Sequence, residues 1–229
     1  MIRIHPSDAR GQANHGWLQA RHSFSFGSWY DPRHMGASAL RVINQDVIAA
    51  RQGFGTHPHD NMEILTYVLR GRLRHADTLG NQADITAGEF QLMSAGTGIR
   101  HSEVNAGDEP VELLQIWLFP NVQDAAPRYA QKRFDRVPGL QCVVAPEGEA
   151  ADALPLRQDA RIHRGLLSAG DGVDQPLAAG RTAWLQLISG KLEVEHQLLQ
   201  AGDGVEITRL PAFRIDALAD SEFLLFDLP

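Results

Sequence analysis

Hydrophobic and polar residues alternate over short runs along most of this chain and rarely recur with helical spacing. Residues 62–69, 111–118 and 183–188 have the length and the β-branched and aromatic content of strands. Glycine-centred turns separate such runs. The pattern closest to a helix covers residues 126–133, where Pro127 suits a first helical turn. Many short strands with glycine turns predict an all-β sandwich or barrel.

The two halves of the chain repeat a strand-turn-strand pattern. Residues 68–73 resemble residues 187–192, and the turn at 87–89 recurs at 201–203. Self-similarity of this kind indicates a duplicated structural unit. We therefore predict two β-barrels in tandem.

The stretch around residues 120–137 lies between these halves. It combines Pro120 and Pro127 with several charges and the one helix-like pattern. We therefore predict a short helical connector there. The predicted divisions are an N-terminal barrel at residues 1–122, the connector at 123–136 and a C-terminal barrel at 137–229.

Candidate metal ligands occur in two short segments, each with i, i+2 spacing. His57 and His59 form the first pair, and His101 and Glu103 form the second. Alternate side chains of a strand project from one face, so each pair aims both members at the same point. Three imidazoles and one carboxylate without a thiolate suit Fe(II), Mn(II), Co(II), Ni(II), Cu(II) or Zn(II), and the residues alone do not select among these ions.

The second half lacks this ligand set. With the repeated glycines as rulers, the counterparts of the four candidate ligands are Pro176, Ala178, Ile215 and Ala217. None of these side chains can bind a metal. We therefore predict one metal site, in the N-terminal barrel, and none in the C-terminal barrel.

Composition limits the functional classes. The chain has 229 residues, 43% of them hydrophobic and 21% charged, as in an ordinary soluble globular protein. Its net charge of -7 and scattered basic residues argue against a nucleic-acid surface. Cys142 is the only cysteine, which fits a reducing compartment. No apolar run has the length of a membrane span or a signal peptide core, so we predict a cytoplasmic protein without a membrane partner.

The candidate ligands lie inside longer motifs. A glycine, a His-x-His pair, a glutamate and a later glycine occur in order, and the second segment ends in a histidine with an asparagine four positions on. These residues are Gly53, His57, His59, Glu63, Gly71, His101 and Asn105. This arrangement resembles the two motifs of the cupin superfamily.

Within that superfamily, residues 55–63 and 94–103 resemble the signatures of the pirin family almost residue for residue. Gly96 stands where other cupins have a proline, as in pirins. The opening residues 14–32 and the closing residues 223–229 also resemble bacterial pirins. The resemblance therefore spans the whole chain.

The pirin resemblance implies two jelly-roll-like cupin barrels that face each other, with one metal ion in the first. It favours Fe(II) and places the metal ligands at His57, His59, His101 and Glu103. Glu63 occupies the general cupin glutamate position, which is not usually a ligand in pirins. By strand parity we predict that Glu63 hydrogen-bonds a ligand imidazole.

In bacterial pirins the resemblance implies a flavonol (quercetin) 2,3-dioxygenase, which opens the ring with O2 and releases CO. We expect Glu103 to act as the base that takes the proton of the flavonol 3-hydroxyl. An apolar cavity would hold the ring. The predicted wall residues are Met62, Phe90, Met93 and Trp117.

The alternative is a metal- or redox-sensing binding protein that acts as a transcription cofactor through a protein partner, without catalysis. A metal site closed to substrate by neighbouring loops would favour that alternative. In either case we expect a monomer without direct contact to nucleic acid.

Overall fold

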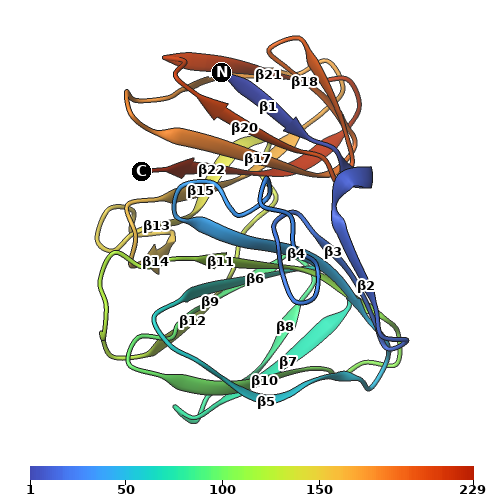
Figure 1. The fold of residues 1–229 in the computed structure, drawn as a ribbon, viewed down its shortest axis with the longest axis vertical. Coiled ribbons are helices and arrows are strands. Elements are labelled where there is room, and N and C mark those ends of the chain that lie inside the picture. The colour runs from blue at the N-terminus through green and yellow to red at the C-terminus, as the bar shows by residue number, and fades with distance from the viewer. The chain divides into compact units, whose positions relative to one another are not determined.

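The computed structural model describes all 229 residues and contains no α-helix. One 3-10 turn, η1 (Ser7–Ala9), accompanies the strands drawn in Figure 1. The all-β prediction is therefore confirmed. Contacts divide the chain into two compact units. The N-terminal unit comprises Gly11–Phe134 and Leu154–Gln158, and the C-terminal unit comprises Met1–Arg10, Asp135–Ala153 and Asp159–Pro229.

The N-terminal unit contains two antiparallel sheets. Its strands are β2 (Gly11–Asn14), β3 (Leu18–His22), β4 (Leu40–Ile48), β5 (Gly53–His59), β6 (Glu63–Arg70), β7 (Arg72–Asp77), β8 (Gln82–Thr86), β9 (Glu89–Ser94), β10 (Ile99–Asn105), β11 (Val111–Leu118), β12 (Arg128–Arg133) and the short β14 (Leu154–Leu156). The larger sheet has the order β12-β9-β6-β11-β4-β3-β2, and the smaller has the order β5-β10-β7-β8. Two such sheets form a jelly-roll-like barrel.

The C-terminal unit repeats this plan. Its strands are β1 (Ile2–His5), β13 (Gly139–Pro146), β15 (Arg161–Leu167), β16 (Gly172–Pro176), β17 (Thr182–Ser189), β18 (Lys191–Val194), β19 (Gln197–Gln200), β20 (Gly204–Thr208), β21 (Ala212–Ala217) and β22 (Ser221–Leu228). The order β16-β21-β18-β19 matches β5-β10-β7-β8, and the larger sheet contains β1-β20-β17-β22-β15-β13. The predicted repeat therefore corresponds to a repeated sheet topology.

The predicted helical connector is wrong. Residues 128–133 form β12, which pairs antiparallel with β9 from Arg128↔Ser94 to Arg133↔Glu89. A helix of eight residues is marginal in water. Pairing with β9 instead satisfies backbone N–H and C=O groups that β9 would leave unpaired if it were the edge strand. The Tyr129 hydroxyl also donates to Oε1 of Gln131 on the same face, at 2.7 Å.

The interiors of the two units differ. In the C-terminal unit one continuous cluster of buried apolar side chains fills the barrel and includes Ile215 and Ala217. In the N-terminal unit the buried apolar residues form separate clusters. On β6, Ile64 belongs to one cluster and Val68 to another, and the buried Thr66 lies between them on the same face. The N-terminal barrel therefore has a polar layer in its middle.

Leu225→Ala is expected to lower the free energy of unfolding by about 2–5 kcal/mol, because it removes a fully buried side chain from a packed cluster. Leu225 is 1% exposed within the apolar cluster of the C-terminal unit. Urea denaturation measures the loss. The control Leu198→Ala removes a side chain that is 58% exposed. A loss for Leu225→Ala no larger than that of the control would contradict the prediction.

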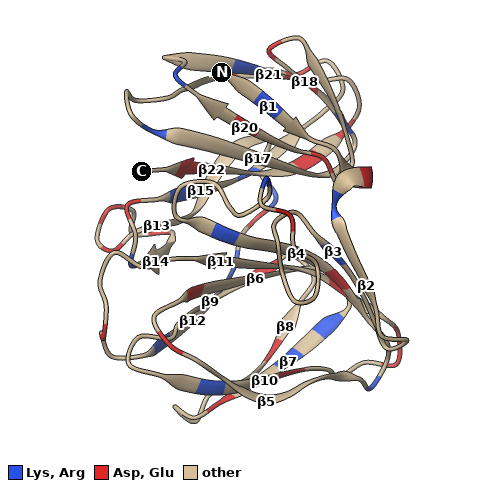
Figure 2. Cartoon of the chain, viewed as in Figure 1, with Lys and Arg blue, Asp and Glu red and all other residues tan.

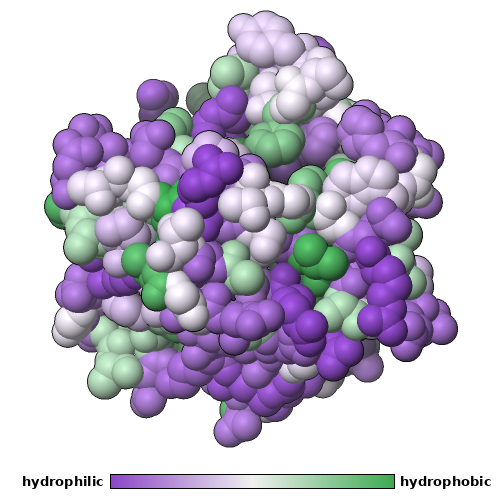
Figure 3. All heavy atoms as spheres, turned by 90° about the horizontal axis from the view of Figure 1, so that it is seen from below, coloured by the Kyte–Doolittle hydropathy of each residue, from purple (hydrophilic) through white to green (hydrophobic).

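Charged residues of both signs are interspersed along the chain (Figure 2). Many pair locally, as in Arg74 with Asp84 at 2.7 Å and Arg214 with Asp216 at 2.9 Å. On the face drawn in Figure 3, hydrophilic residues predominate and hydrophobic ones form small separate groups. No helix has the length and hydropathy needed to cross a membrane. The paired charges differ from the concentrated basic surface that a phosphate backbone requires.

Candidate metal centre

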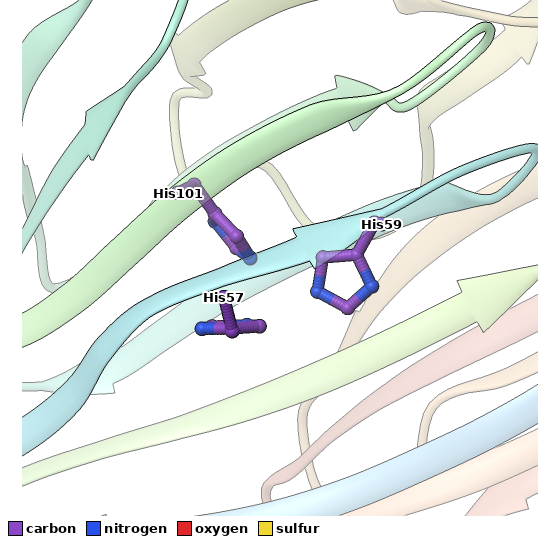
Figure 4. Close-up of side chains that lie close together, drawn as sticks. All are labelled: His57, His59 and His101. Carbon is purple, nitrogen blue, oxygen red and sulfur yellow. The ribbon is translucent and has the colours of Figure 1, made fainter.

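The pairing of β5 with β10 brings the three predicted histidine ligands together. His101 lies opposite His57, and Ile99 lies opposite His59. The ring centroids are 4.4 Å apart for His57 and His101, and 4.9 Å apart for each of the other two pairs. One ligand nitrogen from each ring lies within 4.8 Å of the others. Figure 4 shows the three imidazoles turned toward one another, and we call them the histidine cluster.

The backbone beside the cluster has an irregular register. His101 pairs with His57, but Glu103 pairs with Phe54, so β5 accommodates one extra residue between these positions. Such a bulge re-aims side chains, a common device next to functional sites. A Cβ on Gly53 would lie 2.3 Å from the backbone oxygen of Glu103, so only glycine allows this approach.

Glu103 projects from β10 into the same interior and is 3% exposed. Its Oε2 accepts a hydrogen bond from Nε2 of Gln115 at 2.7 Å, and its Oε1 accepts one from Oγ1 of Thr66 at 3.2 Å. A carboxylate oxygen of Glu103 lies within 4.8 Å of ligand nitrogens of both His75 and His101. Glu103 thus adjoins the histidine cluster on the His101 side, and its metal ligation remains a prediction.

The protonation of the cluster suits a cation. Burial lowers the pKa of His59 to about 4, aided by the neighbouring imidazoles of His101 and His57. Burial also lowers the pKa of His101 to about 3. Nδ1 of His57 lies 2.8 Å from the carbonyl oxygen of Gly55, which can only accept, so in the neutral ring Nε2 carries the lone pair. At neutral pH His59 and His101 therefore present uncharged nitrogen donors.

The hydrogen bonding of His101 also indicates whether the histidine cluster suits a metal ion. Both ring nitrogens of His101 are buried and neither has a hydrogen-bond partner. A buried polar atom without a partner is costly unless a ligand satisfies it. Three imidazoles whose ligand nitrogens lie within 4.8 Å of one another fit the geometry and donor chemistry of a divalent metal site.

The histidine cluster opens into a cavity of about 750 Å³. His57, His59, Glu103 and Gln115 line one part of it. Aromatic side chains form much of the remaining wall: Trp17, Phe26, Trp29, Phe54 and Trp117. This volume lies within the roughly 300–1,000 Å³ typical of small-molecule sites. The cavity can hold a planar aromatic compound beside the metal site.

The prediction of the cavity wall is wrong for most of its residues. Only Trp117 of the four predicted residues lines the cavity. Phe90 stacks on Tyr67 with ring centroids 3.9 Å apart, and Met93 packs in an apolar cluster with Ile64. The sequence pattern identified these residues as hydrophobic but did not show which strand face meets the cavity.

Comparison with known proteins covers nearly the whole chain. The family model described as "Pirin" matches residues 4–118, and the one described as "Quercetinase C-terminal cupin domain" matches residues 142–228. The chain belongs to the pirin family. Each barrel of this pirin is a cupin domain.

Individual relatives agree over the full length. "Quercetin 2,3-dioxygenase" of Escherichia coli K12 is 49% identical over 100% of this chain and 99% of its own length. "Pirin-like protein" of Caulobacter vibrioides is 43% identical over 99% of both chains. The crystal structure of bacterial pirin YhhW in complex with nickel(II), from Escherichia coli, has a TM-score of 0.97 and 48% identity and covers 100% of this chain and 99% of that chain.

Glu63 of this pirin does not hydrogen-bond a ligand imidazole, contrary to prediction. Its Oε2 accepts from Oγ of Ser94 at 2.8 Å and from the backbone N–H of Arg157 at 3.2 Å. The parity argument failed because β5 ends at His59 and the chain turns at Asn61, whose φ is 42°. Glu63 therefore belongs to a buried network outside the histidine cluster.

A histidine that the sequence did not mark lies beside the cluster. His75 is fully buried, and its ring centroid is 5.3 Å from that of His101. Its Nε2 lies 2.9 Å from Oδ2 of Asp77. Burial acts to raise the pKa of Asp77, but hydrogen bonds from His75 and Asn81 outweigh it and lower that pKa. The i, i+2 spacing of His75 and Asp77 was the available signal, since it repeats that of the ligand pairs.

Glu63→Gln is expected to become more stable relative to the parent as pH rises. Burial raises the pKa of Glu63 above its ordinary value of 4.5, against the hydrogen bond from Ser94. Because this pKa is raised in the folded state, the contribution of Glu63 to the free energy of unfolding is complete below its pKa in the unfolded chain. That contribution is lost as pH rises through its pKa in the folded protein. Glutamine does not ionise, so its advantage should grow by about 1.4 kcal/mol for each unit by which the pKa is raised.

Urea unfolding of both proteins from about pH 4 to about pH 8 measures this difference. The matched control is Glu109→Gln, which makes the same change at an exposed glutamate. A Glu63→Gln difference that stays flat or decreases with pH would contradict the assignment of a raised pKa.

Proposed function

We propose that this pirin is a metal-dependent quercetin 2,3-dioxygenase that cleaves a flavonol ring with O2 and releases CO. The observation that carries the proposal is a histidine cluster opening into an aromatic cavity of about 750 Å³. Identity of 49% over the full length to a protein named for this activity supports it. A cavity open beside the metal site also favours an enzyme over a closed redox sensor.

The proposed metal ligands are His57, His59, His101 and Glu103. Fe(II) is the proposed ion, and Mn, Co, Ni, Cu and Zn also suit such donors. The nickel(II) complex of YhhW supports a divalent ion in a relative of this sequence. When bound, the ion would supply Lewis-acid stabilisation of negative charge on the 3-oxygen of the flavonol.

The protein groups have distinct proposed tasks. Trp17, Phe54 and the other aromatic wall residues would hold the planar ring and exclude bulk water. Glu103 would take the proton of the 3-hydroxyl, because its carboxylate is buried in the interior and also lines the cavity. The ionised flavonol and dioxygen then give carbon monoxide and a depside. We further propose that the enzyme is monomeric and cytoplasmic.

The test supplies the purified protein with Fe(II), Mn(II), Co(II) or Ni(II) without oxygen, then adds quercetin and air. We expect loss of the flavonol absorbance together with release of carbon monoxide. The metal-free protein is the control for uncatalysed oxidation. Absorbance that decays no faster than in this control, with every one of these metals, would overturn the proposal.

A further inference from the structure

A row of polar side chains crosses the inner face of the larger sheet of the N-terminal unit. Strand registers place these residues directly opposite one another from strand to strand. The members of the row are His22 on β3, Asn44 on β4, Gln115 on β11, Thr66 on β6 and Gln91 on β9. All of them are at most 9% exposed. We call them the polar row.

Folding alone does not require this row, because the C-terminal unit lacks its central part. The chain repeat that matches residues 68–73 with 187–192 places Leu185 at the position of Thr66. Leu185 lies opposite Leu225 and Val205, as Thr66 lies opposite Gln115 and Gln91. The matched side chains in the C-terminal unit all belong to its apolar cluster. A barrel of this plan therefore folds with hydrocarbon where the N-terminal unit has buried polar groups.

Burying such groups is costly unless they are hydrogen-bonded. The centre of the row receives Glu103 from the facing sheet. Gln115 Nε2 donates to Oε2 of Glu103 at 2.7 Å, and Thr66 Oγ1 lies 3.2 Å from Oε1 of Glu103. The repeat matches Leu73 with Leu192, whose partners are Asn105 and Ala217, so Ile215 of the apolar cluster stands at the position of Glu103. The glutamate and its polar partners are thus present together in one unit and absent together in the other.

Thr66 has a second acceptor within reach. Its Oγ1 lies 3.1 Å from Oε1 of Gln115 as well as 3.2 Å from Oε1 of Glu103. A hydroxyl has one proton, so it donates to one of these oxygens at a time. A charged carboxylate attracts the proton more strongly than a neutral amide. If Oε1 of Glu103 engages another partner, Thr66 can turn to Gln115 without leaving a buried donor unsatisfied.

We propose that Gln115 and Thr66 are positioning residues that hold the Glu103 carboxylate beside the histidine cluster and let one of its oxygens change partner. Both act through Glu103. The inference rests on the proposed function for the role of that carboxylate as ligand and base. Removing a residue that hydrogen-bonds and orients a metal ligand typically lowers metal affinity by about 10- to 100-fold.

The test is a double-mutant cycle on nickel(II) affinity, measured by competition with a chromogenic chelator. Gln115→Leu is expected to weaken nickel binding about 10-fold or more in the parent protein. In a Glu103→Ala background the same substitution should change affinity by less than about twofold, because the group it positions is gone. Thr66→Val should behave in the same way with a smaller effect, and Thr66→Ser should restore the parent affinity.

Gln91→Leu is the matched control. It removes a buried amide from the same row, and no hydrogen bond joins Gln91 to Glu103. Its nickel affinity should equal that of the parent. An equal loss from Gln115→Leu with and without Glu103, or no loss in either, would overturn the proposal. If Gln115→Leu does not fold, Thr66→Val decides by the same criterion.

Quercetin takes no part in these titrations. A coupled cycle in a protein that leaves quercetin intact would retain the positioning role and reject the proposed activity. An uncoupled cycle in a protein that cleaves quercetin would reject the positioning role and retain the proposed activity.

Discussion

His101→Ala is expected to abolish both metal retention and flavonol cleavage. His101 is the most buried member of the histidine cluster, at 1% exposed, and its ring centroid lies within 4.9 Å of both other ring centroids. The two remaining imidazoles and the proposed ligand Glu103 would hold a divalent ion more weakly than the full set. Loss of the several kcal/mol that such an ion supplies to a developing negative charge corresponds to about 1,000-fold or more in rate.

Metal analysis after dialysis and the quercetin assay measure the two effects. His196→Ala is the matched control, since that side chain is 93% exposed on the C-terminal unit. We expect about one ion per chain and the parent rate for the control. A His101→Ala protein that keeps its ion and its rate would show that the cluster is not the metal site.

The common direction of each ligand pair was predictable because it depends on local rules, whereas the pairing of β5 with β10 brings the two pairs together. The i, i+2 spacing of His57 and His59 fixes them on one strand face, and the spacing of His101 and Glu103 does the same. Ile215 and Ala217, which the sequence repeat matched with His101 and Glu103, lie in the apolar cluster of the C-terminal unit.

The parts that the sequence did not reveal depend on long-range pairing. The segment at residues 128–133 has a weak local preference, and β9 determined its conformation by offering an unpaired edge. Trp17 and Phe54 read as scattered hydrophobic residues, and only the sheet register shows that they line the cavity. Likewise β1 pairs with β20, far away in sequence, so nothing near residues 2–5 indicates its unit.

Gln115 and Thr66 were missed for a further reason. Each occurs in a run that alternates as a strand should, so each was treated as part of an ordinary strand. Only the pairing of β6 with β11 places them side by side, and only the facing β10 gives them Glu103 as a partner. The position of a buried polar residue relative to the site is a tertiary property.

Glu103→Gln is expected to separate catalysis from metal binding. Glutamine keeps the size of the side chain and can still accept the hydrogen bond from Gln115, so the fold should remain intact. It cannot accept a proton at neutral pH. Loss of a general base typically lowers the rate by about 100- to 10,000-fold.

The three imidazoles of the histidine cluster remain in Glu103→Gln, so nickel(II) should still bind, although more weakly than in the parent. The measurement is kcat for quercetin at saturating metal, alongside nickel affinity. Glu109→Gln, at an exposed position, provides the control for loss of one negative charge. His101→Ala should lose ion and rate together, whereas Glu103→Gln should lose rate with the ion bound. A metal-saturated Glu103→Gln protein with kcat within about threefold of the parent would exclude Glu103 as the base, because even a modest general base contributes about 100-fold.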